Sequence, residues 1–226
     1  MEAIERTHPI INIITRTSGR PNDFQKNREW LLNQTYQNYR HIVSCDDKDT
    51  VEYVKKHGCD KLVEIDRKSL MNDPDYVGKI PNPRTGPYSL HNLYMNECHK
   101  HVEDGWIMYV DDDDRLYTLD SLKEIADAIL SADEDTIIYW QIHIRSYNTI
   151  PRIIDERNPP RMRQISSQCF TFHSKYKDAV RWDDWKCGDF RFIHKLHAIV
   201  NKHRFLNKPL VFTPRDNNGN RKDGNL

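Results

Sequence analysis

Four consecutive carboxylates, at residues 111–114, follow an apolar run at residues 106–110. A short apolar run that begins after a turn residue, here Gly105, is typical of a buried strand. We therefore expect the strand to end where the carboxylates begin. Four adjacent negative charges repel one another, and a divalent cation, which prefers oxygen ligands, would compensate them. A solvated acidic surface loop is the alternative that these four residues leave open.

A second polar stretch follows the β-branched run at residues 10–14. This run predicts a strand, and a helix is expected to begin near Pro21. The loop between them carries Arg16 and Arg20. Loop amides, a helix N-terminus and guanidinium groups together favour an anion such as a phosphate. Two solvated surface arginines are the alternative.

A third stretch, at residues 39–45, is also typical of a strand and ends at Asp46 and Asp47. A helix at residues 50–57 and a strand at residues 61–66 are expected next. Alternating strands and helices predict an α/β fold with a mainly parallel central sheet and helices on both faces. In such sheets ligands bind beyond the carboxyl ends of the strands, so the three polar stretches are expected to line one crevice.

The composition narrows the class of protein. The 226 residues are enough for one domain, and 34 basic residues balance 34 acidic ones, which argues against a nucleic-acid partner. Five cysteines without a C-x-x-C spacing argue against a disulfide framework and a zinc knuckle. Charged residues precede the first apolar run, which argues against a signal peptide, and no apolar run approaches the roughly 18 residues of a membrane span. We expect a soluble, cytoplasmic protein with no integral membrane segment.

The remaining elements are expected as follows. Residues 67–87 are rich in proline and predict a long functional loop. Helices are expected at residues 88–101 and 119–130, and strands at residues 136–144, 169–172 and 209–213.

Carboxylates alternate with aromatic residues near position 185, beginning with Trp182, Asp183 and Asp184. Aromatic faces beside carboxylates can hold a sugar, whose C–H face packs on the ring while its hydroxyls are hydrogen-bonded. A capped helix that enters the core, with Asp189 in its first turn, is the alternative.

The chain resembles family 2 of the inverting glycosyltransferases, which have the GT-A fold. The first match is Gln-Thr-Tyr-x-Asn at residues 34–38, followed by a strand that ends in paired aspartates. The second is Asn96, fifteen positions before the first carboxylate of the strand-terminal Asp-x-Asp-Asp. The resemblance covers residues 9 to about 115 well and the rest weakly. It implies a single GT-A domain over residues 1–226.

In that domain, residues 9–115 would form the nucleotide-sugar half, 116–212 the acceptor half and 213–226 a flexible tail. The resemblance also implies the donor site. Its residues would be Thr15, Arg16, Arg20, Asp46, Asn96, Asp111, Asp112 and Arg215.

Asp111 and Asp113 would be the two positions of the Asp-x-Asp motif, and they would hold a Mn²⁺ or Mg²⁺ ion that neutralises the leaving diphosphate. Asp112 lies between them but points the other way. The family often has arginine before the helix asparagine, where this chain has Met95. That donor contact is therefore missing or comes from Lys79 or Arg84.

An inverting transfer needs one base to take the proton of the acceptor hydroxyl. The family has this base in a Gly-Glu-Asp or similar motif before a helix, so the resemblance assigns the role to Asp189, with Asp183 and Asp184 in reserve. One of three histidines near the end of the chain could complete the set of metal ligands. A position in the core or on the surface is the simpler interpretation of each. They are His194, His197 and His203.

The leading hypothesis is a metal-dependent inverting glycosyltransferase that moves a sugar from a nucleotide-sugar, preferably UDP-linked, to a glycan, lipid-linked or protein-linked acceptor. A catalytically inactive nucleotide-binding or sugar-binding module of the same fold is the second hypothesis. A sugar-nucleotide pyrophosphorylase is the third, but it would need a glycine-rich phosphate loop, and the loop after the first predicted strand has only Gly19.

Overall fold

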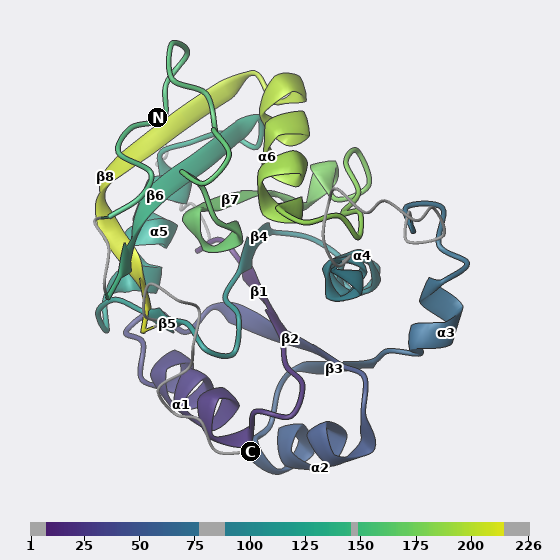
Figure 1. Ribbon diagram of the computed structural model, residues 1–226. Helices are drawn as coiled ribbons and strands as arrows, with labels where there is room; N and C mark the ends of the chain where they lie inside the picture. The colour runs from purple at the N-terminus through teal and green to yellow at the C-terminus, as the bar shows by residue number, and fades with distance from the viewer. Residues whose placement is uncertain (1–7, 77–88, 146–148, 215–226) are drawn as a thin grey trace.

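The computed structural model describes residues 8–76, 89–145 and 149–214. Its centre is an eight-stranded sheet in the order β3-β2-β1-β4-β7-β6-β8-β5 (Figure 1). The strands are β1 Ile11–Arg16, β2 Tyr39–Cys45, β3 Lys61–Glu64, β4 Trp106–Tyr109, β5 Arg115–Leu116, β6 Thr136–Ile144, β7 Phe170–His173 and β8 Lys202–Thr213. The α-helices are α1 Pro21–Leu32, α2 Lys48–His57, α3 Arg67–Leu70, α4 Tyr94–His99, α5 Ser121–Leu130 and α6 Gly188–Ile199, and the 3-10 helices are η1 Leu90–Leu93, η2 Ser167–Cys169 and η3 Ser174–Tyr176.

The sheet has a parallel part and a mixed part. Strands β3, β2, β1 and β4 are parallel neighbours. Beyond β4 the short strand β7 runs antiparallel to both β4 and β6, while β8 runs parallel to β6 and antiparallel to β5. The predicted α/β class with one sheet is confirmed. The sheet is more mixed than expected because β7 enters between β4 and β6 in the opposite direction.

Helices cover both faces of the parallel part. Helices α1 and α2 lie on one face, and α4 lies on the other, against β1 and β2 (Figure 1). Side chains on both faces of β1 and β4 are buried, which explains their continuous apolar sequence. Gly105 precedes β4 with φ +90°, and a Cβ there would lie 2.5 Å from the carbonyl oxygen of Ile10. Only glycine allows β4 to enter the sheet this closely beside β1.

The Gln-Thr-Tyr stretch connects the two parts of the chain. The side chain of Gln34 donates to the carbonyl of Thr118 (2.9 Å) and accepts from the amide of Leu122 (3.1 Å). The amide of Thr35 donates to the carbonyl of Leu119 (2.9 Å). These contacts hold the start of α5 against the end of α1, so this part of the family motif has a structural role here.

Predicted and observed elements differ at several places from residue 88 onward. Strand β8 spans Lys202–Thr213 instead of residues 209–213, because its first residues pair with β6 although few of them are buried. The expected helix at residues 88–101 is a 3-10 turn, η1, followed by the short helix α4. The two-residue strand β5 has no apolar pattern of its own and exists by pairing with β8.

Two buried histidines make stability depend on pH. Burial lowers the pKa of His41 to about 3 and that of His99 to about 4. The folded state keeps both rings neutral, whereas the unfolded chain protonates them below about pH 6.5. Since the unfolded state then binds more protons, the free energy of unfolding should fall as the pH drops from about 6.5 toward 4, by about 1.4 kcal/mol per pH unit for each histidine.

Urea unfolding between pH 7 and pH 4.5 measures this slope. We expect His41→Gln, whose amide can still donate to the hydroxyl of Thr15 as the ring does at 2.9 Å, to reduce the slope. The same substitution at the exposed His8 should leave it unchanged. An unchanged slope in His41→Gln would contradict the assignment.

No helix within the described ranges is both long enough and apolar enough to cross a membrane.

Candidate functional site

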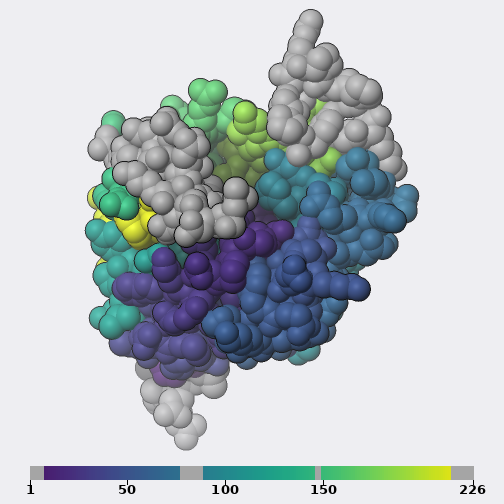
Figure 2. All heavy atoms as spheres, turned by 60° about the horizontal axis from the view of Figure 1, so that its bottom comes forward, coloured from purple at the N-terminus to yellow at the C-terminus, as the bar shows by residue number. Residues whose placement is uncertain are grey.

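A pocket of about 290 Å³ lies where β1, β2 and β4 end. We call this side of the sheet the carboxyl edge. The pocket is lined by Arg16, Thr17, Ser18, Arg20, Asp46, Arg67, His91, Tyr94 and Asp111. In the space-filling view the N-terminal segment, in purple, lies directly beside the segments in blue that follow it in the chain (Figure 2). All three polar stretches that were expected to converge contribute to this pocket.

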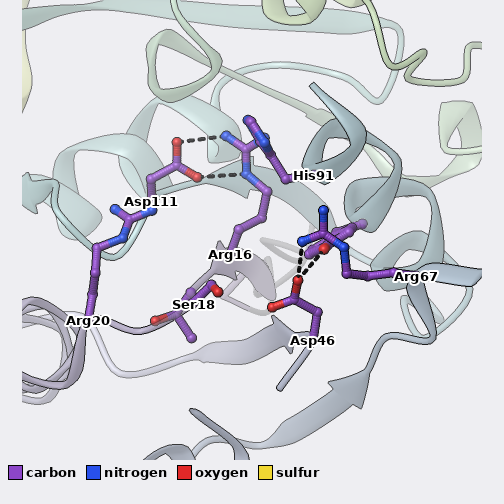
Figure 3. A pocket seen from close by; sticks show the side chains of 9 residues that line it. Arg16, Ser18, Arg20, Asp46, Arg67, His91 and Asp111 are labelled. Atoms are coloured by element: carbon purple, nitrogen blue, oxygen red, sulfur yellow. Dashed lines mark hydrogen bonds and ion pairs between the residues drawn. The ribbon is translucent and has the colours of Figure 1, made fainter. Parts of the chain in front are cut away.

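Arg16 and Asp111 form the central contact of the pocket (Figure 3). The Nε and Nη2 atoms of Arg16 donate to the two carboxylate oxygens of Asp111, at 2.9 and 2.7 Å. Both side chains are about 15% exposed. Burial acts to lower the pKa of Arg16, but the attraction to Asp111 outweighs it and the net shift is upward. The guanidinium is thus a permanent positive charge at the pocket wall.

The turn after β4 is held by α1. The side chain of Asn27 donates to the carbonyls of Asp111 (3.1 Å) and Asp114 (3.0 Å). Arg20 lies within 2.5 Å of a carboxylate oxygen of Asp112 and 3.2 Å of one of Asp113. Burial raises the pKa of Asp112 to about 7 even though Arg20 opposes the shift. Asp112 is therefore a buried partner of Arg20 and does not line the pocket, which corrects its assignment to the donor site.

Asp46 lies on the opposite side of the pocket, at the end of β2. Its Oδ2 atom accepts hydrogen bonds from Arg67 and Tyr94, both at 2.7 Å. Burial acts to raise the pKa of Asp46, but these two donors outweigh it and the net shift is downward. Asp46 is therefore an ionised acceptor, with Arg67 as a donor beside it.

Asp189 lies at the start of α6, within electrostatic range of Arg16 and Asp111. Its Oδ1 atom accepts from the amide of Phe190 at 2.8 Å. Burial raises the pKa of Asp189, although Phe190 and Arg16 oppose the shift. The carboxylate assigned as base thus lies near the donor-side residues, although 78 positions separate it from Asp111 in the sequence.

Two residues predicted for the donor site have other contacts. The hydroxyl of Thr15 is fully buried and donates to the carbonyl of Val110 at 2.7 Å, so it connects β1 to β4. The pocket is lined instead by the three residues that follow, Arg16, Thr17 and Ser18. The amide group of Asn96 donates to the carbonyl of Trp182 (2.8 Å) and accepts from its amide (2.9 Å). Asn96 is 3% exposed and fixes the backbone behind the pocket.

The reserve carboxylates are less available than Asp189. Asp183 accepts hydrogen bonds from Arg191 at 3.0 and 3.1 Å, and the side chain of Asp184 is fully buried. His197 and His203 stack on each other, with ring centroids 3.6 Å apart. His203 pairs with Ile137 at the start of β6, on the side of the sheet opposite the carboxyl edge. The stacked pair therefore cannot complete a metal shell in this pocket.

His194 is exposed and packs on Phe190, 5.3 Å between centroids. Lys79, Arg84 and Arg215, which were expected to supply further donor contacts, lie outside the described residues.

Besides Arg67 and Tyr94, three further residues near the pocket were not predicted from the sequence. Gln168 of η2 donates to Asp111 at 3.1 Å, and Asn92 of η1 accepts from Arg16 at 3.2 Å. His91 lines the pocket, and burial together with Arg16 lowers its pKa to about 4, so the ring is neutral at physiological pH. Polar residues within short 3-10 helices show no periodicity, and only the tertiary fold brings them to the pocket.

The acidic turn fits a divalent cation in its donor chemistry, because carboxylate oxygens are the ligands that Mg²⁺ and Mn²⁺ prefer. Among the residues that the model places, no group of three or more His, Cys, Asp or Glu side chains could hold a metal ion. Mg²⁺ is commonly bound by one or two carboxylates together with the phosphates of a substrate. Asp113 and Asp111 suit that arrangement, although both oxygens of Asp111 contact Arg16 in this structure.

Comparisons with solved structures give the fold family. S. aureus TarS, residues 1–349, matches with a TM-score of 0.65 at 15% identity, over 90% of this chain and 60% of that one. The same protein in complex with UDP-GlcNAc matches with 0.64 at 16% identity, over 91% and 59%. The mannosyltransferase PcManGT from Pyrobaculum calidifontis, in complex with GDP-Man and Mn²⁺, matches with 0.61 at 12% identity, over 94% and 59%.

The chain has a GT-A-like fold. It spans about 60% of the length of these structures. No protein-family model matches the sequence, and no curated protein matches it.

Proposed function

We propose that this chain is a glycosyltransferase that moves a sugar from a nucleotide-sugar to an acceptor hydroxyl. The observation that carries the proposal is the meeting of Arg16, Asp46 and Asp111 in one pocket at the carboxyl edge of a GT-A-like sheet, with Asp189 within electrostatic range of Arg16. Three arginines line the pocket and only two carboxylates do. Three guanidinium groups at one pocket suit a diphosphate, because they donate paired hydrogen bonds to phosphate oxygens, and each of them contacts a carboxylate in this structure.

The nucleotide base would bind at the Asp46 side of the pocket. An ionised carboxylate beside the Arg67 donor offers both an acceptor and a donor to the edge of a base. A UDP-linked donor is the form we favour. One structure of the same fold was solved with UDP-GlcNAc and another with GDP-Man, so both nucleotides belong in the test.

Asp189 would act as the base of a single displacement. Its carboxylate accepts the proton of the acceptor hydroxyl while that oxygen forms a bond to the anomeric carbon. The bond from that carbon to the diphosphate oxygen breaks on the opposite face, which inverts the configuration. The nucleoside diphosphate leaves with the electron pair, and Arg16 and Arg20 stabilise its charge. A bound Mn²⁺ or Mg²⁺ ion, held by Asp113 and Asp111, would neutralise further charge on the diphosphate.

Thermal unfolding with UDP, GDP or dTDP, each with and without Mn²⁺, tests this function. A ligand that binds only the folded state at 100 times its dissociation constant adds about 2.7 kcal/mol to the free energy of unfolding. We expect one nucleotide to stabilise the protein, and more so with Mn²⁺. A panel of nucleotide-sugars should then release that nucleoside diphosphate.

No stabilisation by any nucleotide, and no release from any donor, would refute the proposal. Stabilisation without release from any donor and acceptor pair would indicate the second hypothesis, an inactive binding module.

A further inference from the structure

Asn92 uses both ends of its side-chain amide. The residue lies in η1, directly after His91, which lines the pocket, and it is 6% exposed. Its Oδ1 atom accepts from Nη1 of Arg16 at 3.2 Å. Its Nδ2 atom donates to the carbonyl oxygens of Asp183 (3.2 Å) and Trp185 (3.0 Å). One side chain therefore contacts the donor-side arginine and the loop before α6 at the same time.

The loop before α6 is fitted to this side chain. Gly188 is buried and begins α6, and a Cβ at this position would lie 2.3 Å from Nδ2 of Asn92. The amide nitrogen of Ser89 also donates to the carbonyl of Asp184 at 2.6 Å. The backbone of residues 183–188 thus follows the surface of η1, and the absence of a side chain at Gly188 leaves room for the amide of Asn92.

The position of Asn92 matters because Asp189 directly follows this loop. Arg16 belongs to β1, and Asp189 belongs to α6, so no local structure fixes one relative to the other. The side-chain amide of Asn92 connects them, because it is hydrogen-bonded both to Arg16 and to the loop before α6. Because a displacement of about 1 Å in a catalytic group can cost roughly 100-fold in rate, such a contact is worth a large factor in turnover.

We propose that Asn92 is a positioning residue that holds the loop at residues 183–188 against Arg16, and so places Asp189 relative to the bound donor. This inference rests on the proposed transferase function. It adds a residue that no family motif in this chain contains, and it couples the donor pocket to the acceptor side.

Three substitutions separate the two ends of the amide. Asn92→Ala removes all three hydrogen bonds. Asn92→Asp keeps an acceptor for Arg16 but replaces the donor to the two carbonyls by a repelling oxygen. Gly188→Ala does not change the Asn92 side chain. It adds a methyl group that would clash with the Nδ2 atom of Asn92.

Asn12→Ala is the matched control. Asn12 is fully buried, and its Nδ2 atom also donates to two backbone carbonyls, those of Asp104 (2.7 Å) and Trp106 (3.3 Å). It lies at the start of β1, away from the carboxyl edge. Its loss should lower stability without changing turnover per folded molecule.

Turnover and hydrogen exchange are the two measurements. We expect all three site variants to lower kcat roughly 10- to 100-fold, with the KM for the donor within about threefold of the wild type in Asn92→Asp. Amide hydrogen exchange of residues 183–191 should become about tenfold faster or more in Asn92→Ala and remain unchanged in Asn12→Ala.

Exchange at residues 183–191 that does not change in Asn92→Ala would overturn the inference, whatever the activity. So would an unchanged kcat, or a kcat loss in Asn12→Ala equal to that in Asn92→Ala. If the wild type neither binds nucleotides nor transfers a sugar, the proposed function fails. The exchange experiment then still shows whether Asn92 holds the loop, and the role toward a bound donor is withdrawn.

Discussion

Replacing Asp189 with asparagine is expected to reduce the turnover number of sugar transfer about 10²- to 10⁴-fold, the usual contribution of a general base. Asparagine has nearly the same shape and still accepts a hydrogen bond from the amide of Phe190, but it cannot take a proton. Binding of the nucleotide should change little, because Asp189 does not line the donor pocket. Steady-state kinetics together with nucleotide titration measure both effects.

The loss of turnover in Asp189→Asn is compared with the loss in a variant of Asp183, one of the two alternative bases. Asp183→Asn removes a carboxylate that is already paired with Arg191, so we expect a much smaller loss. Equal losses in the two variants would contradict the assignment of Asp189.

The pH profile of kcat adds a second check. Since the base must be ionised and burial raises its pKa, kcat should fall with decreasing pH through a value above 3.8, and this limb should vanish in Asp189→Asn.

Replacing Arg16 with alanine is expected to weaken binding of the nucleoside diphosphate about 10- to 100-fold. A hydrogen bond to a charged group contributes about 1.5–3 kcal/mol, and 1.4 kcal/mol corresponds to a factor of ten. The substitution also leaves the carboxylate of Asp111 in the pocket wall without its guanidinium partner, so the site becomes more negative. Isothermal titration with the nucleotide identified by thermal unfolding measures the change in affinity.

Arg16→Lys keeps the charge but loses the planar fork that contacts both oxygens of Asp111, so we expect only partial recovery. Arg40→Ala is the control. Arg40 lies near the start of β2 and pairs at 3.5 Å with Glu103, which is mostly exposed, so its loss should not affect binding. Full affinity in Arg16→Ala would show that the diphosphate binds elsewhere.

Two strands, one in each part of the sheet, follow directly from local sequence. Strands β2 and β6 begin and end at the predicted residues, because each is an apolar, β-branched or aromatic run with clear turn signals on both sides. Strand β8 does not show such a run. Its first eight residues include His203, Asn207 and Lys208, and what makes them a strand is pairing with β6. That pairing depends on the tertiary fold and leaves no periodic pattern.

The residues of the candidate site were likewise predictable only in part. Arg16, Asp46 and Asp111 could be predicted because each lies at or just beyond the carboxyl end of a strand, and parallel strands end at one edge. Asn96 lies at the motif position, yet its amide is used by the backbone of Trp182, 86 residues away. Asn92, in contrast, belongs to no motif and was not predicted. Besides Arg16, its partners are two backbone carbonyls, which any sequence would supply, so no residue pattern reveals the contact with the loop before α6.

The place of β4 in the sheet has a consequence for engineering. Within the part of the chain that the model covers, β4 alone among the strands is hydrogen-bonded both to the parallel group and to the mixed group. The chain crosses between the groups at the acidic turn, and β5 to β8 all follow it in sequence. The segment after residue 114 can therefore be exchanged as one continuous unit. A chimera that exchanges it, while retaining Gln168 and Gly188 for their contacts with Asp111 and Asn92, is expected to keep the proposed nucleotide pocket and to replace the proposed acceptor side.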